Sequence, residues 1–316
     1  MPRYQPTDAM MLPRFSGIRT FARLPHVTDL TDVDVAVIGS PFDTGGTYRV
    51  GCRFGPAHIR EASALLRPYN PSLDVNVYDY ISAIDYGDLP VVPGFIEAAY
   101  DQMVEGLMPV LNAGVIPILL GGDHSISLAH LRAMALRHGP VALIHFDSHN
   151  DLWDQYWGQK YTHGTPFRRA LEEGLIDVKR SSEVGLRGSV YGPEDIQMGR
   201  DFGFQVFTMD EVRELGFAHV LKMVREQAGT GPCFLTFDID FIDPAYAPGT
   251  GTPEVGGPTT WEALQCVRAL KGLNFVGFDV VEVLPSYDSP GQVTALAAAN
   301  VAFEMLSLVA WSRKHR

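Results

Sequence analysis

His145-Phe146-Asp147-Ser148-His149-Asn150-Asp151 directly follows an apolar, β-branched run, and it is the stretch that decides the fold. Side chains on a strand alternate between its two faces. Asp147, His149 and Asp151 are therefore predicted to converge on one face, while the two residues between them point away. Such polar groups at the end of a buried strand are typical of an open parallel α/β sheet, which binds its ligand outside the carboxyl ends of the strands.

Two further segments carry the same kind of side chain. Asp238-Ile239-Asp240 repeats the i, i+2 spacing after the apolar run 233–237, and His124 lies in Gly121-Gly122-Asp123-His124-Ser125 after the run 115–120. Each segment alone also fits a polar turn or a helix cap. Together they supply two imidazoles and four carboxylates, a negative charge that requires divalent cations if it is buried. The sequence therefore predicts a binuclear metal site with the ligands His124, Asp147, His149, Asp151, Asp238 and Asp240.

The apolar runs recur along the chain with helical patterns between most of them. The predicted strands are 33–39, 75–80, 116–120, 142–146, 182–186, 205–207, 233–237 and 274–283. The predicted helices are 56–66, 95–112, 125–137, 209–227, 259–270 and 293–311. This alternation predicts a parallel sheet covered by helices on both faces.

The chain has 316 residues, 46% of them hydrophobic and 20% charged, which suits one large α/β domain spanning 1–316. No linker or fixed-period repeat divides it. The stretch 1–32 is rich in proline and polar residues, and we expect this N-terminal extension to pack on the surface or on a neighbouring subunit.

Charge and cysteine content bound the partners and the compartment. The formal net charge of −12 argues against nucleic acid or an anionic membrane as a partner. No run reaches the ~18 uninterrupted apolar residues that a membrane helix needs, and the N-terminus lacks the order of a secretory signal. The three cysteines, Cys52, Cys233 and Cys266, lack metal-ligand spacing and are expected to be reduced thiols. We therefore expect a cytoplasmic protein.

The sequence resembles the ureohydrolase family of arginases, agmatinases and guanidino-acid hydrolases. The family's three signatures correspond to GGDHS (121–125), HFDSHND (145–151) and FDIDFIDPAYAPGTGTPEVGG (237–257). The match extends to segments 41–56, 162–169 and 280–288, and thus to almost the whole chain. Segments 163–177 and 187–195 are most similar to bacterial guanidinopropionases and guanidinobutyrases. The resemblance implies an arginase-type three-layer α/β/α fold with an eight-stranded, mainly parallel sheet.

The resemblance also implies a reaction and its residues. It implies an amidinohydrolase that converts a guanidino compound to urea and an amine by attack of a metal-bridging hydroxide on the guanidinium carbon. Two divalent ions are implied, Mn²⁺ as the family's usual metal and Ni²⁺ as the alternative. His163 matches the proton-shuttling histidine, Glu282 matches the guanidinium-binding glutamate, and Asp151 is counted with both as catalytic. A salt bridge between Glu282 and Arg53 is the alternative reading of that buried carboxylate.

The chain departs from its relatives after Asp151, where they commonly carry a small residue and then Asn. Here Leu152-Trp153 follows, and Trp153, Tyr156 and Trp157 cluster within five residues. Aromatic faces suit apolar or cationic groups better than carboxylates. If the rings face the substrate, a short apolar or cationic tail is favoured, as in an alkylguanidine or biguanide such as dimethylguanidine or metformin.

Several alternatives remain open at this point. The rings could instead pack against a neighbouring subunit, and 3-guanidinopropionate, 4-guanidinobutyrate or agmatine could be the substrate. Asn150, Trp153, Tyr156 and Glu282 are the predicted substrate-binding residues. The family resemblance implies a homo-oligomer, a trimer or hexamer, and a hetero-oligomer with a homologous subunit is the variant. Two other functions are a catalytically silent subunit of such a mixed oligomer and a hydrolase of a formimino substrate.

Overall fold

The computed structural model describes residues 2–315 and contains one eight-stranded sheet of order β4-β1-β5-β10-β9-β6-β7-β8. All neighbouring pairs in it are parallel. Its strands are β1 (Val35–Ser40), β4 (Ala83–Asp88), β5 (Ile116–Gly121), β6 (Ala142–Phe146), β7 (Ser182–Leu186), β8 (Gln205–Thr208), β9 (Pro232–Asp238) and β10 (Asn274–Val281). A separate hairpin pairs β2 (Tyr69–Asn70) with β3 (Val75–Asn76).

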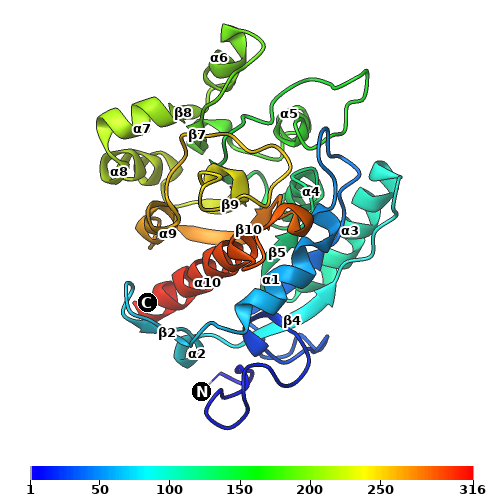
Figure 1. Cartoon of the computed structure of the whole chain (residues 1–316), viewed down its shortest axis with the longest axis vertical. Coiled ribbons are helices and arrows are strands. Elements are labelled where there is room, and N and C mark those ends of the chain that lie inside the picture. Colours follow the sequence, from blue (N-terminus) through cyan, green and yellow to red (C-terminus); the bar gives the residue numbers. More distant parts are fainter. Residues whose placement is uncertain (1, 316) are drawn as a thin grey trace.

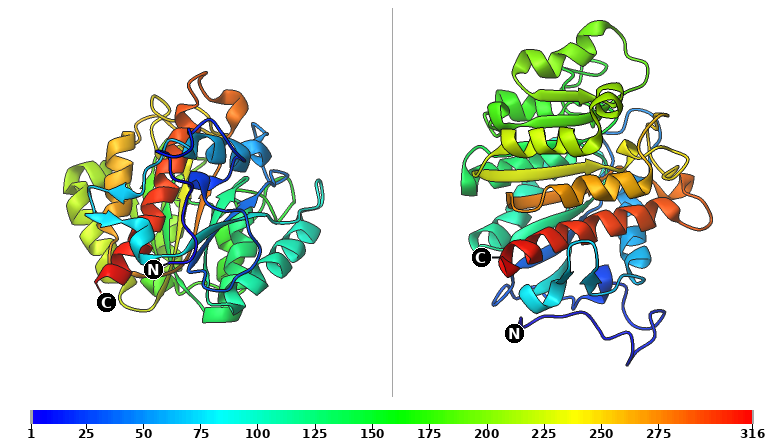
Figure 2. Two further views of the ribbon diagram at one scale, coloured as in Figure 1. Left: turned by 90° about the horizontal axis from the view of Figure 1, so that it is seen from below. Right: turned by 90° about the vertical axis from the view of Figure 1, so that its left-hand side faces the viewer.

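Helices cover both faces of the sheet, with an apolar core on each side (Figures 1 and 2). One face carries α1 (Gly55–Ser63), α7 (Met209–Leu215), α8 (Phe217–Ala228), α9 (Thr260–Ala269) and α10 (Val293–Lys314). The other carries α3 (Ile96–Asn112), α4 (Ile126–His138), α5 (Pro166–Glu172) and α6 (Pro193–Phe202). Seen from below, the strands lie between these two layers (Figure 2, left). The predicted three-layer α/β/α fold is therefore confirmed.

Several elements differ from the sequence prediction. The stretch 75–80, predicted as a strand, is a two-residue hairpin strand followed by α2 (Val77–Tyr80). The strand that joins the main sheet is instead β4. Its buried Asp85 interrupts the apolar pattern by which a buried strand is predicted. Arg60 of α1 donates Nε to Asp85 Oδ2 at 2.8 Å and Nη2 to Oδ1 at 2.9 Å. The ion pair lets an edge strand keep a carboxylate that an apolar pattern would not contain.

The helix predicted at 209–227 is two helices, because Gly216 at φ 82° ends α7 and starts α8. α10 is long and apolar enough to cross a membrane by composition, yet 83% of its apolar window is buried inside the fold. It runs beside α1 as a core helix (Figure 1).

The N-terminal extension lies along the β4 edge of its own sheet. Tyr4 donates its backbone N–H to Ser82 Oγ at 2.9 Å, and Phe21 donates its N–H to Asp85 Oδ2 at 2.7 Å. Five large apolar side chains of this segment remain exposed, namely Met10, Met11, Leu12, Phe15 and Ile18.

Candidate metal centre

Three strands of the sheet centre, the adjacent pair β9 and β6 and, beyond β10, β5, deliver the six predicted ligands to the carboxyl ends of the strands. His124 follows β5, the segment 147–151 follows β6, and Asp238 and Asp240 lie at the end of β9 and in the 3-10 turn η4 (Ile239–Phe241). Five of the six side chains are buried, and His149 is partly exposed. The parallel arrangement gathers these side chains because all three strands end at the same edge.

The predicted mechanism of convergence is wrong in detail. β6 ends at Phe146, so strand alternation does not order the residues that follow. Instead, the carboxylates accept backbone N–H groups two residues on: His149 N donates to Asp147 Oδ1 at 2.7 Å, and Asp240 N donates to Asp238 Oδ1 at 2.8 Å. Ser148, expected to point away, donates its hydroxyl to Asp240 Oδ1 at 2.6 Å.

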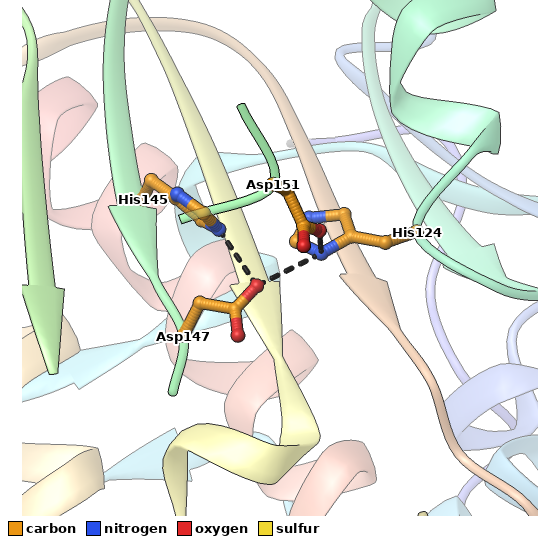
Figure 3. Close-up of side chains that lie close together, drawn as sticks. All are labelled: His124, His145, Asp147 and Asp151. Carbon is orange, nitrogen blue, oxygen red and sulfur yellow. Dashed lines mark hydrogen bonds and ion pairs between the residues drawn. The ribbon is translucent and has the colours of Figure 1, made fainter. Parts of the chain in front are cut away.

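Three carboxylate oxygens surround one nitrogen of His124. Its Nδ1 lies 3.0 Å from Asp147 Oδ2, 2.9 Å from Asp151 Oδ2 and 3.2 Å from Asp238 Oδ2. Figure 3 shows Asp147 and Asp151 directed at this nitrogen. The opposite nitrogen, Nε2, lies 2.8 Å from Thr236 Oγ1, which leaves Nδ1 to face the carboxylates.

A second group forms around His149. Its Nδ1 lies 3.1 Å from Asp240 Oδ2 and 3.4 Å from Asp147 Oδ1. Asp147 thus directs one carboxylate oxygen to each histidine. Two adjacent groups of ligands that share a carboxylate have the form of a binuclear site.

Burial and charge show that these residues fit divalent cations. Among the residues described, His124 Nδ1 and Asp240 Oδ2 are buried without a hydrogen-bond partner. Burial and the neighbouring carboxylates Asp240 and Asp147 raise the pKa of Asp238. Mixed oxygen and imidazole donors suit a first-row divalent ion such as Mn²⁺, and the absence of thiolates argues against structural zinc.

His163 and Glu282 form a hydrogen-bonded pair beside this centre. His163 Nδ1 lies 2.9 Å from Glu282 Oε1, which also accepts the backbone N–H of His124 at 2.8 Å. Burial lowers the pKa of His163, but the charge and hydrogen bond of Glu282, together with the charges of Asp123 and Asp151, outweigh it and raise that pKa to about 9. Arg53 pairs with Asp43, with Nε 2.6 Å from Oδ1, so the alternative salt bridge to Glu282 is not formed.

A cavity of about 780 Å³ opens over the centre. His149, Asp151, Asp238 and His163 line its inner part. Five Tyr and Trp side chains contribute to its wall, and four of them form a chain of ring contacts: Trp153, Tyr156, Trp157 and Tyr191, with Tyr48 as the fifth.

Asn150, a predicted substrate-binding residue, does not line the cavity. It is 4% exposed, its Nδ2 donates to the Asp195 carbonyl at 2.5 Å, and its Oδ1 accepts Leu152 N. Both ends of its amide are used within the chain, so the prediction that it binds substrate is corrected to a role in holding the loop. Asp195 also accepts Trp153 Nε1–H at 2.9 Å, which anchors the aromatic wall to α6.

Comparison with known proteins identifies the family. The arginase family model matches residues 33–307. The chain belongs to the arginase family. It is 46% identical to a guanidinopropionase of Pseudomonas aeruginosa, over 98% of this chain and 96% of that protein. Proclavaminate amidinohydrolase of Streptomyces clavuligerus superposes with a TM-score of 0.91 at 40% identity, covering 95% of this chain and 99% of that one. A formiminoglutamase of Trypanosoma cruzi described with Mn²⁺ gives a TM-score of 0.81 at 27% identity, covering 90% and 96%.

As a member of the arginase family, the protein is a ureohydrolase, a hydrolase that acts on the C–N bond of guanidino compounds. Sequence reasoning missed two residues around its arginase-family centre. His145 Nε2 lies 2.8 Å from Asp147 Oδ2 (Figure 3), and Thr236 contacts His124. His145 lies on β6 two residues before Asp147, and its histidine side chain within the signature segment was the signal that could have marked it. Thr236 offered no signal, because threonine is common in strands.

Proposed function

We propose that the six side chains hold two divalent ions, Mn²⁺ first and Ni²⁺ as the alternative, and that the enzyme releases urea from a guanidino compound. The support is the pair of ligand groups around His124 and His149, joined by Asp147. When bound, the two ions would supply a water of lowered pKa and stabilise negative charge that develops at the reacting carbon.

The roles proposed for His163 and Glu282 follow from their positions. A planar guanidinium presents paired N–H donors, which a carboxylate such as Glu282 accepts and thereby orients. Glu282 is 2% exposed and has φ 64°, a left-handed conformation that is rare for a side chain of this size. The fold holds it there because Glu282 N donates to the Gly122 carbonyl at 2.8 Å. His163 is the group proposed to carry the proton that the departing nitrogen needs.

For the substrate tail, we propose a short apolar or cationic group, as in dimethylguanidine or metformin. The aromatic wall of Trp153, Tyr156 and Trp157 supports this choice, because ring faces attract apolar and cationic groups. Glu254 lines the same cavity and has no cationic partner within ion-pair distance among the residues described. A carboxylate at that position favours a cationic tail over an anionic one.

A guanidino acid is the second candidate, and one observation favours it. Arg49 also lines the cavity, with its guanidinium 4.4 Å from the Tyr287 ring centre, and no carboxylate of residues 2–315 pairs with it. A free guanidinium suits a substrate carboxylate. The 46% identical relative is a guanidinopropionase, which supports 3-guanidinopropionate over 4-guanidinobutyrate or agmatine.

The deciding experiment loads metal-free protein with Mn²⁺ or Ni²⁺ and measures urea release. The substrates are agmatine, 4-guanidinobutyrate, 3-guanidinopropionate, guanidine, dimethylguanidine and metformin. We expect the highest kcat/KM for an alkylguanidine or biguanide. Preference for 3-guanidinopropionate would establish the second candidate. Silence on every substrate would favour a subunit that requires a different partner chain, and ammonia or formamide from a formimino compound would reveal the third function.

Trp153 tests which groups contact the tail. Trp153→Asn restores the amide common in relatives, so we expect kcat/KM for dimethylguanidine to fall and that for 3-guanidinopropionate to rise, each by about tenfold. Trp153→Phe is the matched control, since it keeps a ring but loses the bond to Asp195. If Trp153→Asn changes all substrates equally, the indole does not select the tail.

We further propose a cytoplasmic homo-oligomer, a trimer or a hexamer. Its support is the row of exposed apolar side chains in the N-terminal extension, because such patches mark interaction surfaces. The cytoplasmic location is supported by the three free cysteines, all of them buried.

A further inference from the structure

Both ring nitrogens of His163 are occupied, and the two partners come from opposite sides. Nδ1 faces Glu282 Oε1 at 2.9 Å. Nε2 faces Thr47, receiving the backbone N–H at 3.1 Å and lying 2.6 Å from the hydroxyl Oγ1. His163 itself is only 8% exposed, whereas Thr47 is partly exposed and lines the cavity.

These contacts determine where the proton of the imidazole resides. A backbone N–H can only donate, so Nε2 must present its lone pair to Thr47. The ring proton therefore lies on Nδ1 and is donated to Glu282. Glu282 alone would favour a doubly protonated ring, but a proton on Nε2 would oppose the Thr47 N–H directly. In its neutral form, His163 thus carries its proton on Nδ1 and is ready to accept a proton at Nε2. The neutral form is the minor one at neutral pH, because the pKa of His163 is raised to about 9.

An imidazole nitrogen has one lone pair, and here both donors of Thr47 converge on it. A molecule in the cavity that approached Nε2 would compete with Thr47 for this lone pair. The backbone N–H cannot pass a proton on, whereas a hydroxyl both donates and accepts. We propose that the Thr47 hydroxyl relays protons between His163 Nε2 and the reacting groups in the cavity. This inference rests on the proposed function.

The relay conserves protons in both directions. On uptake, the Oγ1–H bond breaks as Nε2–H forms, and Oγ1 takes a replacement proton from the attacking water. On delivery, Nε2 returns its proton to Oγ1, which passes its own proton to the departing nitrogen. That nitrogen receives the electron pair of the breaking C–N bond, so the amine leaves neutral and His163 returns to its starting form. The positive charge of the guanidinium stays on the carbon fragment, which releases one proton to solvent and leaves as urea.

Two substitutions separate the hydroxyl from the rest of Thr47. Thr47→Val keeps the shape and the backbone N–H but removes Oγ1, while Thr47→Ser keeps the hydroxyl. On the best guanidino substrate, we expect Thr47→Val to lower kcat by about 10- to 100-fold with little change in KM, and Thr47→Ser to stay within about threefold of wild type. Metal content should be equal in all three proteins.

A solvent deuterium isotope experiment distinguishes a relay from a packing role. Rates in mixtures of H₂O and D₂O should give a curved proton inventory for the wild type, because more than one proton moves, and a linear one for Thr47→Val. A wild-type kcat in Thr47→Val, or an equal loss of kcat in Thr47→Val and Thr47→Ser, would overturn the relay. Neither result would contradict the proposal that the enzyme releases urea.

A second measurement needs no turnover and so stays decisive if no substrate is hydrolysed. Nitrogen-15 NMR of histidine-labelled protein, with His163→Gln to identify the signal, reports which ring nitrogen carries the proton. Above pH 9, where the raised pKa of His163 leaves the ring mainly neutral, we expect the wild type to carry the single ring proton on Nδ1. A neutral ring with its proton on Nε2 would overturn the proposal by itself.

Discussion

At the scale of single residues, Asp147 is the carboxylate that the two ligand groups share. One of its carboxylate oxygens faces His124 and the other faces His149. Asp240 contacts only the second histidine. We therefore expect Asp147→Ala to lose both metals and Asp240→Ala to retain about one per chain, with activity falling more than about 100-fold in each case because both ions are needed.

Metal analysis of the purified variants, with circular dichroism as a test of folding, checks this expectation. Asp101→Ala removes an exposed carboxylate of α3 that makes no ion pair among the residues described, and it should keep wild-type metal content. Full occupancy in folded Asp147→Ala would contradict the shared-ligand arrangement.

How far the sequence predicts the site depends on the kind of residue. The type and spacing of carboxylates and histidines at strand ends indicate their chemistry, so the sequence alone predicted the six candidate ligands that the structure brings together. Asn150 was misassigned, because nothing in its type distinguishes an amide that meets substrate from one that caps Asp195. Thr47 was missed because its importance comes from lying 2.6 Å from His163, 116 residues away in the chain.

At the scale of secondary-structure elements, the first residue of α1 packs against the carboxyl ends of the strands, where the site lies. A Cβ added to Gly55 would lie 2.7 Å from the Val283 carbonyl and 2.8 Å from the Gly121 carbonyl. Backbone atoms cannot yield as a flexible side chain does. We expect Gly55→Ala to lower the free energy of unfolding by roughly 1–3 kcal/mol or more, measured by chemical denaturation.

Gly291→Ala is the matched control for that substitution. The nearest atom to its added Cβ is Ser289 Oγ at 3.8 Å, so stability should change little. Equal stability of the two variants would show that α1 shifts freely against β5.

The same scale explains which elements the sequence predicts. Central strands such as β1 and β5 are buried on both faces and read as continuous apolar runs. β4 is an edge strand whose Asp85 is neutralised by Arg60, and its pattern cannot reveal a partner that lies 25 residues earlier. Ion pairs between residues far apart in the chain therefore limit the prediction of strands from local sequence. Strands that are buried on both faces are easier to predict.

At the scale of the whole molecule, the exposed apolar side chains of the N-terminal extension need a partner. Phe15 is 80% exposed and Ile18 83%, although the same segment is fixed to the β4 edge through Tyr4 and Phe21. An anchored apolar surface is better explained by a second copy than by solvent. Light scattering should therefore give the wild type a mass that is a multiple of 34.8 kDa.

The double variant Phe15→Glu, Ile18→Glu should dissociate, because each new charge would have to be buried at the contact. Leu136→Glu alters an equally exposed apolar residue, 70% exposed on α4, and should leave the mass unchanged. A wild type of 34.8 kDa would contradict the oligomer. If the double variant stays assembled, the subunit interface does not involve the N-terminal extension. This segment lies at the β4 edge, whereas the ligands of the metal centre come from β5, β6 and β9. We therefore expect dissociated protein to keep its metal. Loss of assembly and loss of the metal centre can then be measured separately.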